Sequence, residues 1–241
     1  RGYEPAIIGP HAAGKIAEDG LDVAVSPLHV HPEDLRGVLE TIRKLHNVAG
    51  FGVTIPHKIS IVPLLDHLSD SARRVGSVNF VRRHEDGTLQ GDNIDGQGFV
   101  EGLAHGGITL QGRRVLQLGA GGAGRAVAFA IAMAGARELV IHNRDQPKAE
   151  ALAADIRAAG LPCAVRAGTA EVQAVDVVVN TTSQGMHAAD APLFDYGTLE
   201  ARHAGADSSM TPEITPLLAA AQAKGCRLGL GKFMLQEQYP P

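Results

Sequence analysis

The chain has 241 residues, of which 44% are hydrophobic and 20% charged, as expected for a globular protein that buries one large core or two small ones. The formal net charge is −4 and the basic residues are spread along the chain, which argues against a nucleic-acid-binding surface. Cys163 and Cys226 fit no disulfide or metal-site spacing and no segment is apolar enough to span a membrane, so we expect a cytoplasmic protein with no bound metal.

Short strand patterns alternate with helical patterns, which predicts an α/β fold. In the first part of the chain we expect strands over 6–9 and 23–30, helices over 12–20 and 31–46, a strand with a closing turn over 50–58, a helix over 60–76 and a hairpin over 77–93. Proline has no N–H to donate, so the third strand should end at Ile55 or Pro56. Asp86-Gly87 is the expected hairpin turn.

A βαβ series follows. Residues 113–144 are typical of a strand, a glycine turn, a long apolar helix and a second strand, and further elements are expected over 146–160 (helix), 174–182 (strand) and 215–225 (helix). This pattern predicts a Rossmann-type, doubly wound dinucleotide-binding domain over 102–225. An N-terminal α/β substrate-binding domain is expected over 1–101, with residues 226–241 returning to it.

A G-x-G-x-x-G pattern lies between the strand and the long helix. In this context the first glycine makes the turn, the second lets the backbone approach a pyrophosphate, and the third lets the helix pack closely, while the helix N-terminus supplies N–H donors. A merely structural turn is the alternative. We therefore expect the whole turn to bind a dinucleotide: Gly119, Ala120, Gly121, Gly122, Ala123 and Gly124.

The end of the second strand in this series distinguishes NADP from NAD. NAD-binding versions usually carry an acidic residue there, whereas this chain has Asn143 and Arg144, with Lys148 one turn later. A guanidinium suits a 2′-phosphate, so NADP is the expected cofactor and NAD the alternative. Asp145 complicates this prediction, because a carboxylate pointing inward would repel the phosphate.

Eight motifs together resemble one known family. GFGVTIPHK, GSVNFV, GDNIDGQGF, LGAGGAGRAV, NRDQPKAE, NTTSQGM, TPEITPLL and GKFMLQEQ occur in the order seen in shikimate dehydrogenases and cover nearly the whole chain from Gly50 onward. The resemblance implies reversible NADPH-dependent reduction of 3-dehydroshikimate to shikimate, in a cleft between a substrate domain and a Rossmann domain. It implies a shikimate-like cyclohexene carboxylate as the small-molecule substrate, and a monomer or homodimer.

By this resemblance Lys58 of VTIPHK and Asp95 of DNIDG form the catalytic pair. Oxidation of a secondary alcohol needs a group that accepts the hydroxyl proton while a hydride leaves to the nicotinamide. Burial of a lysine favours the neutral amine that can accept this proton, whereas a neighbouring carboxylate favours the charged form. The sequence leaves that balance open, and a solvated lysine in a turn is the alternative.

The same matching implies further site residues. Thr181 and Thr182 correspond to the segment beside the nicotinamide, and His57 is expected to shape its turn rather than to move protons. Gln236 is a weaker alternative for the substrate glutamine, and ordinary strand or turn roles are the alternatives for the others. The residues implied for holding the substrate hydroxyls are Thr54, Asn79, Asn93 and Gln238.

The N-terminal region departs from the family pattern. A Ser-x-Ser pair that holds the substrate carboxylate normally follows the first strand, but here AIIGP runs directly into HAAGKIAEDG. Either the natural protein lacks this loop or the sequence omits it, and we favour the omission. We likewise expect chain before Arg1 and a further helix after Tyr239.

Four substitutions each remove a polar group that the family carries near its site: Gly52, Phe80, Ile94 and Met210. A site with fewer hydrogen-bonding partners binds a polyhydroxylated ring less well. The alternatives are therefore a quinate or aminoshikimate dehydrogenase using NAD or NADP, or a catalytically silent nucleotide-binding sensor. Retention of both Lys58 and Asp95 argues against the sensor.

Overall fold

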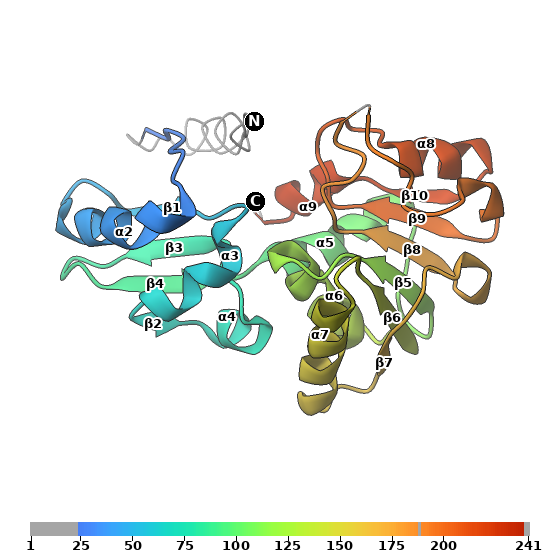
Figure 1. Ribbon diagram of the computed structural model, residues 1–241, viewed down its shortest axis with the longest axis horizontal. Coiled ribbons are helices and arrows are strands. Elements are labelled where there is room, and N and C mark those ends of the chain that lie inside the picture. Colours follow the sequence, from blue (N-terminus) through green and yellow to red (C-terminus); the bar gives the residue numbers. More distant parts are fainter. Residues whose placement is uncertain (1–23, 188, 239–241) are drawn as a thin grey trace.

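The structure, a computed structural model, describes residues 24–187 and 189–238. The strand expected over 6–9, the helix expected over 12–20, the position of the Ser-x-Ser loop and the last three residues lie outside this range. The described part forms two α/β units, each built on its own sheet (Figure 1). No helix within it is long and apolar enough to cross a membrane.

The described residues of the first unit form a four-stranded sheet with the order β1-β3-β4-β2. Strand β3 pairs antiparallel with both β1 and β4, and β2 runs parallel to β4. The apolar side chains of α2 at positions i, i+4 and i+7 pack into the core of this unit. The elements are η1 (Pro32–Asp34), α2 (Leu35–Lys44), β1 (Gly50–Gly52), α3 (His57–Ser60), η2 (Val62–Leu64), β2 (His67–Leu68), α4 (Asp70–Val75), β3 (Phe80–Arg83) and β4 (Leu89–Asp92).

The hairpin prediction is confirmed, and Gly87 takes the left-handed conformation (φ 87°) that its turn requires. The strand predicted over 23–30 is wrong for 24–30, which form neither helix nor strand, because none of these residues pairs with a strand of the described sheet. The third strand ends at Gly52 and not at Ile55 or Pro56. The regular pairing with β3 ends three residues before Ile55, while the turn itself lies at Ile55 and Pro56, where the His57 N–H bonds the Thr54 carbonyl at 2.9 Å.

The single helix predicted over 60–76 is also wrong, because this segment is divided among the end of α3, η2, β2 and α4. Tertiary pairing decides this outcome. The Asp66 N–H bonds the Leu89 carbonyl at 3.0 Å, which draws the following residues into the sheet beside β4. Ser69 then begins a new helix, where its hydroxyl accepts the Ala72 N–H at 3.0 Å as an N-cap.

The second unit contains a six-stranded, all-parallel sheet with the order β10-β9-β8-β5-β6-β7. Counted from β5, this is the strand order of a Rossmann fold, and the predicted fold class is confirmed. The order reverses between β5 and β8, which is where such sheets bind nucleotides. The strands are β5 (Arg114–Leu118), β6 (Glu138–His142), β7 (Ala164–Ala167), β8 (Val177–Asn180), β9 (Ala204–Asp207) and β10 (Arg227–Gly229).

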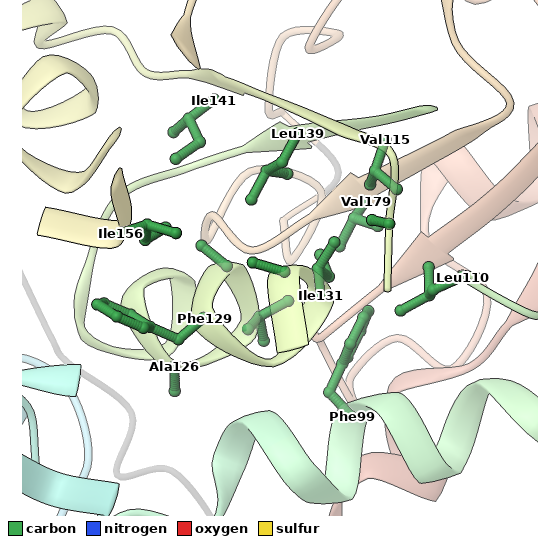
Figure 2. Packing of buried hydrophobic residues seen from close by; sticks show 14 of the residues in the cluster. Phe99, Leu110, Val115, Ala126, Phe129, Ile131, Leu139, Ile141, Ile156 and Val179 are labelled. Atoms are coloured by element: carbon green, nitrogen blue, oxygen red, sulfur yellow. The ribbon is translucent and has the colours of Figure 1, made fainter. Parts of the chain in front are cut away.

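Helices cover both faces of this sheet. Figure 2 shows the side chains of α6 between sheet residues such as Leu139 and Val115 on one side and Phe99 of α5 on the other. Leu217 of α8 packs in a separate cluster with sheet residues such as Leu116. The helices are α5 (Asp95–Leu103), η3 (Ala104–Gly106), α6 (Gly122–Met133), α7 (Gln146–Ala158), η4 (Val172–Ala174), η5 (Tyr196–Thr198), α8 (Pro216–Ala223) and α9 (Gly231–Gln236).

The return of the chain to the first domain differs from the prediction. Residues 226–241 were expected to leave the nucleotide domain, but Arg227–Gly229 form β10 and pair with β9. The edge of β9 offers unpaired backbone groups that this short strand satisfies. Helix α9 then packs along α5. We therefore propose domain boundaries within α5 and immediately after β10.

Candidate active site

Lys58 and Asp95 form a nearly buried ion pair. The lysine Nζ lies 2.5 Å from the carboxylate Oδ2, and their side chains are only 14% and 5% exposed. Lys58 lies on α3, where its carbonyl accepts the Val78 N–H at 2.8 Å, and Asp95 is the first residue of α5. Removal of either partner would leave an uncompensated buried charge, so the two residues depend on one another.

Two of the predicted substrate residues bind the other carboxylate oxygen. Asn79 and Gln238 donate to Oδ1 of Asp95 at 2.9 and 3.2 Å. The Asn79 Oδ1 accepts the Ile94 N–H at 3.0 Å, which also fixes the turn that leads into α5. With Lys58 on Oδ2, the carboxylate has donors on both oxygens and a single orientation. The predicted residues Lys58, Asp95, Asn79 and Gln238 thus lie together.

Asn93 and Thr54 have different environments. Asn93 is 4% exposed, donates to the carbonyl and hydroxyl of Ser77 at 3.1 and 2.9 Å, and accepts the Asp95 N–H at 3.2 Å. Its geometry therefore matches the turn-forming alternative. Thr54 is half-buried, and its hydroxyl has no hydrogen-bond partner among the described residues. His57 bonds the Val30 carbonyl through Nε2 at 2.8 Å, a contact that anchors its turn.

The glycine turn follows β5 and has the geometry that a dinucleotide requires. Gly119 is left-handed (φ 108°), and a Cβ there or at Gly124 would lie 2.7 or 2.8 Å from the Thr181 hydroxyl oxygen. A Cβ at Gly121 would meet nothing within 4 Å, and Gly121 is exposed, so its backbone is open to a ligand. The first N–H groups of α6 begin here and supply a positive dipole for a pyrophosphate.

The glycine turn also contacts Lys58. A Cβ on Gly122 would lie 2.6 Å from the Cβ of Lys58, so only a glycine lets the lysine stem pack this closely. The Ser77 hydroxyl donates to the Gly122 carbonyl at 3.1 Å beside this contact. Lys58 of the first unit and the glycine turn of the second unit are therefore in direct contact.

The end of β6 fits a phosphate-bearing ribose. Asn143 accepts the Ala120 N–H at 3.2 Å, which ties this strand end to the glycine turn. Lys148 pairs with Asp145 at 3.1 Å, and this pairing removes the repulsion that the bare carboxylate would cause. Arg144 is exposed and has no partner among the described residues, so its guanidinium is available for a 2′-phosphate.

Replacing Arg144 with alanine should raise the KM for NADP by at least about tenfold, which corresponds to about 1.4 kcal/mol, because one charged hydrogen-bonding group is lost. The KM for NAD should remain unchanged, since NAD has no 2′-phosphate. Steady-state kinetics with both cofactors measures this difference. Arg137→Ala, on another part of the surface, is the control. An equal rise in the KM for NADP and in the KM for NAD would contradict the cofactor assignment.

Thr181 and Thr182 follow β8 and border the glycine turn. The Thr181 hydroxyl donates to the Leu118 carbonyl at 2.9 Å, and Thr182 bonds Asn180 Oδ1 through both its N–H and its hydroxyl, at 2.9 and 2.7 Å.

The sequence analysis missed Gln117, which is fully buried in β5 and donates to the carbonyls of Gly119 and Gly124. The sequence feature that could have identified Gln117 is a polar residue within an otherwise apolar strand.

A second missed group is the buried carboxylate of Asp207, at the end of β9. It accepts hydrogen bonds from Asn180, Thr215 and the Ser209 N–H at 2.8 to 2.9 Å. Through Asn180 this network reaches the segment of Thr182. Burial away from water is the largest influence and raises the pKa of Asp207 above its ordinary 3.8, although the hydrogen bonds oppose it.

The raised pKa of Asp207 predicts a dependence of stability on pH. The folded state holds this proton to a higher pH than the unfolded chain, so the free energy of unfolding should fall as pH rises from 3.8 through the folded-state pKa. Asp207→Asn should abolish this component. Urea unfolding of both proteins between about pH 4 and pH 7 measures it. Parallel stability curves for the two proteins would contradict the prediction.

Comparison with protein families identifies both units. Residues 10–81 match the family described as the shikimate dehydrogenase substrate binding domain, and residues 103–200 match that described as shikimate/quinate 5-dehydrogenase. A shikimate dehydrogenase (NADP(+)) from Geobacter metallireducens is 40% identical over 227 residues, which are 90% of this chain and 79% of that protein. The match therefore extends across both units.

Two solved structures are similar over nearly the whole chain. Shikimate 5-dehydrogenase from Thermus thermophilus, in complex with NADP(H) and shikimate, has a TM-score of 0.83 and 34% identity, covering 94% of this chain and 83% of that one. Ligand-free 5-ketofructose reductase of Gluconobacter sp. strain CHM43 has a TM-score of 0.83 and 33% identity, covering 97% and 86%. The two-unit arrangement is therefore common to proteins with different substrates.

Proposed function

The chain belongs to the shikimate dehydrogenase family of NAD(P)-dependent oxidoreductases, and on that premise we propose that it catalyses the reversible NADP-dependent reduction of 3-dehydroshikimate to shikimate. The family predicted from the motifs is thereby confirmed. One observation carries the proposal: the side-chain stem of Lys58, whose amine is paired with Asp95, packs directly against Gly122 of the glycine turn. A proton-transfer group and a dinucleotide turn in contact are what alcohol oxidation requires.

In the oxidation direction, the proposed role of Lys58 is to take the proton from the substrate hydroxyl, for which its Nζ must be the neutral amine. A bound nicotinamide would supply the hydride acceptor for the carbon that carries this hydroxyl, and that carbon would become a carbonyl. Asp95 orients the amine, and its own orientation depends on Asn79 and Gln238. In the reduction direction Lys58 returns the proton to the carbonyl oxygen.

Binding of NADP is assigned to two parts of the second unit. The residues from Gly119 to Gly124 would take the pyrophosphate, with Thr181 and Thr182 beside the nicotinamide. Asn143, Arg144 and Lys148 would take the 2′-phosphate end. The open space at Gly121 and the available guanidinium of Arg144 support this assignment.

The proposal is tested by initial rates of oxidation of shikimate and of quinate, each with NADP and with NAD. Turnover of shikimate with NADP is the expected result. Activity on quinate alone, or with NAD alone, would replace it with the corresponding alternative. NADPH binding without any turnover would favour a nucleotide sensor, and the absence of NADPH binding would also overturn the cofactor assignment.

A second candidate function is the reduction of a ketose such as 5-ketofructose. The similarity to a 5-ketofructose reductase favours it, and the accessible side chains of Phe80 and Met210, which are 39% and 37% exposed, mark positions where this chain departs from the shikimate dehydrogenase motifs. Phe80 lies directly opposite Gly52 in the β1–β3 register, so a polar pair is replaced by an aromatic ring and an open position. Adding 5-ketofructose with NADPH to the same assay distinguishes the two functions.

A further inference from the structure

Five consecutive residues, Val75–Asn79, connect the nucleotide helix to the catalytic pair, and we call them the bridging segment. On the nucleotide side, the Val75 carbonyl accepts a hydrogen bond from Arg125 Nε at 2.7 Å. Two residues later, the fully buried Ser77 donates to the Gly122 carbonyl at 3.1 Å. Both partners lie in the first turns of α6, so the segment is bound to the helix that begins at the glycine turn.

On the catalytic side, the same bridging segment contacts both members of the ion pair. The Val78 N–H donates to the Lys58 carbonyl at 2.8 Å, and the Asn79 side chain donates to the Asp95 carboxylate at 2.9 Å. Asn93 links the buried Ser77 to the Asp95 N–H. A displacement of the segment relative to α6 would therefore displace Lys58 and Asp95 together.

Arg125 is the charged anchor of this arrangement. Its guanidinium binds the Val75 carbonyl through Nε and the Asp155 carboxylate of α7 through Nη2 at 2.8 Å, and its side chain is 18% exposed. Gly76 ends α4 in the left-handed conformation (φ 68°), and a Cβ there would lie 3.1 Å from Nη2. The glycine thus lets the planar guanidinium pack closely against the end of α4.

We propose that Arg125 is a positioning residue that fixes the bridging segment on α6 and thereby sets the placement of Lys58 and Asp95 against the glycine turn. The two hydrogen bonds of its guanidinium connect the two units, because one goes to α4 and the other to α7. This inference rests on the proposed function only where turnover is the measured quantity.

The kinetic consequence follows from geometry. A reacting group displaced by about 1 Å can lose about 100-fold in rate, so Arg125→Ala should lower kcat about 10- to 100-fold. The KM for NADP and the dissociation constant of NADPH should stay unchanged. Arg125→Lys should recover only part of kcat, because a single ammonium cannot reproduce two contacts of a planar fork.

Arg157→Ala is the matched control. Arg157 also donates from its guanidinium to a backbone carbonyl, that of Val165 at 2.8 Å, but both groups belong to the second unit. The Arg157→Ala variant also loses a guanidinium–carbonyl hydrogen bond of the fold, but it should keep its kcat. A normal kcat in Arg125→Ala, an equal fall of kcat in Arg157→Ala, or a loss of NADPH affinity that parallels the loss of kcat would each overturn the proposal.

Hydrogen exchange provides a test that needs no substrate. The Val78 N–H, which is hydrogen-bonded to the Lys58 carbonyl, should exchange faster in Arg125→Ala than in the unmodified protein or in Arg157→Ala. If the unmodified protein oxidises none of the tested alcohols but this difference is present, the proposed function fails and the positioning role stands. Unchanged exchange at the bridging segment would overturn the positioning role whatever the substrate.

Discussion

Replacing Lys58 with methionine is expected to lower kcat for shikimate oxidation by about 10²- to 10⁴-fold, the usual contribution of a positioned proton-transfer group. Methionine is an unbranched side chain that can fill much of the space of the lysine stem against Gly122, but it has no amine. NADPH binding should be retained, because the charge that is removed belongs to the first unit. Single-turnover kinetics and NADPH fluorescence titration measure the two quantities separately.

Stability must be followed in the same experiment, because Asp95 is 3% exposed and would remain buried without its cation. Loss of one partner of a buried pair costs about 3–5 kcal/mol, so Lys58→Met alone should unfold at a lower urea concentration. The double variant with Asp95→Asn should regain stability and remain inactive. Lys232→Met, which breaks an exposed pair with Glu213, is the control and should keep kcat. Retained turnover in Lys58→Met would exclude this lysine as the proton acceptor.

Replacing Gly121 with alanine is expected to raise the KM for NADP by at least about tenfold, or about 1.4 kcal/mol, without loss of stability. The φ of this residue is −79°, which alanine adopts freely, and its Cβ would meet no protein atom within 4 Å. The methyl group would instead occupy the space through which a pyrophosphate approaches the backbone. Steady-state kinetics and urea unfolding measure the two effects.

Two glycine controls make this prediction specific. Gly37→Ala places a Cβ in equally open space on α2, so it should leave the KM unchanged and raise helix stability by about 0.5–1 kcal/mol. Gly119→Ala should instead destabilise the fold, because its Cβ would lie 2.7 Å from the Thr181 hydroxyl at a left-handed position. An unchanged KM in Gly121→Ala would show that no ligand approaches this turn closely.

Local chemistry was sufficient to predict several elements. The glycine turn between β5 and α6 was recognised because its spacing serves backbone conformation and helix packing, both of which are local properties. The β3–β4 hairpin was predicted from its Asp86-Gly87 turn. The strands β7, β9 and β10 were missed. Strand β9 consists of Ala204–Asp207, small residues with little strand propensity, and it exists because β8 and β10 pair with both of its edges.

By itself the sequence determined the α/β class, the nucleotide turn and the identity of the residues expected in the site, because these depend on local pattern and motif. Only the tertiary structure decided their geometry. Lys58 and Asp95 are 37 residues apart and meet because α3 and α5 are joined through the bridging segment. The role of Arg125 had no local signal, since its partners Val75 and Asp155 come from different units. Contacts between distant segments depend on packing, which no short window of sequence contains.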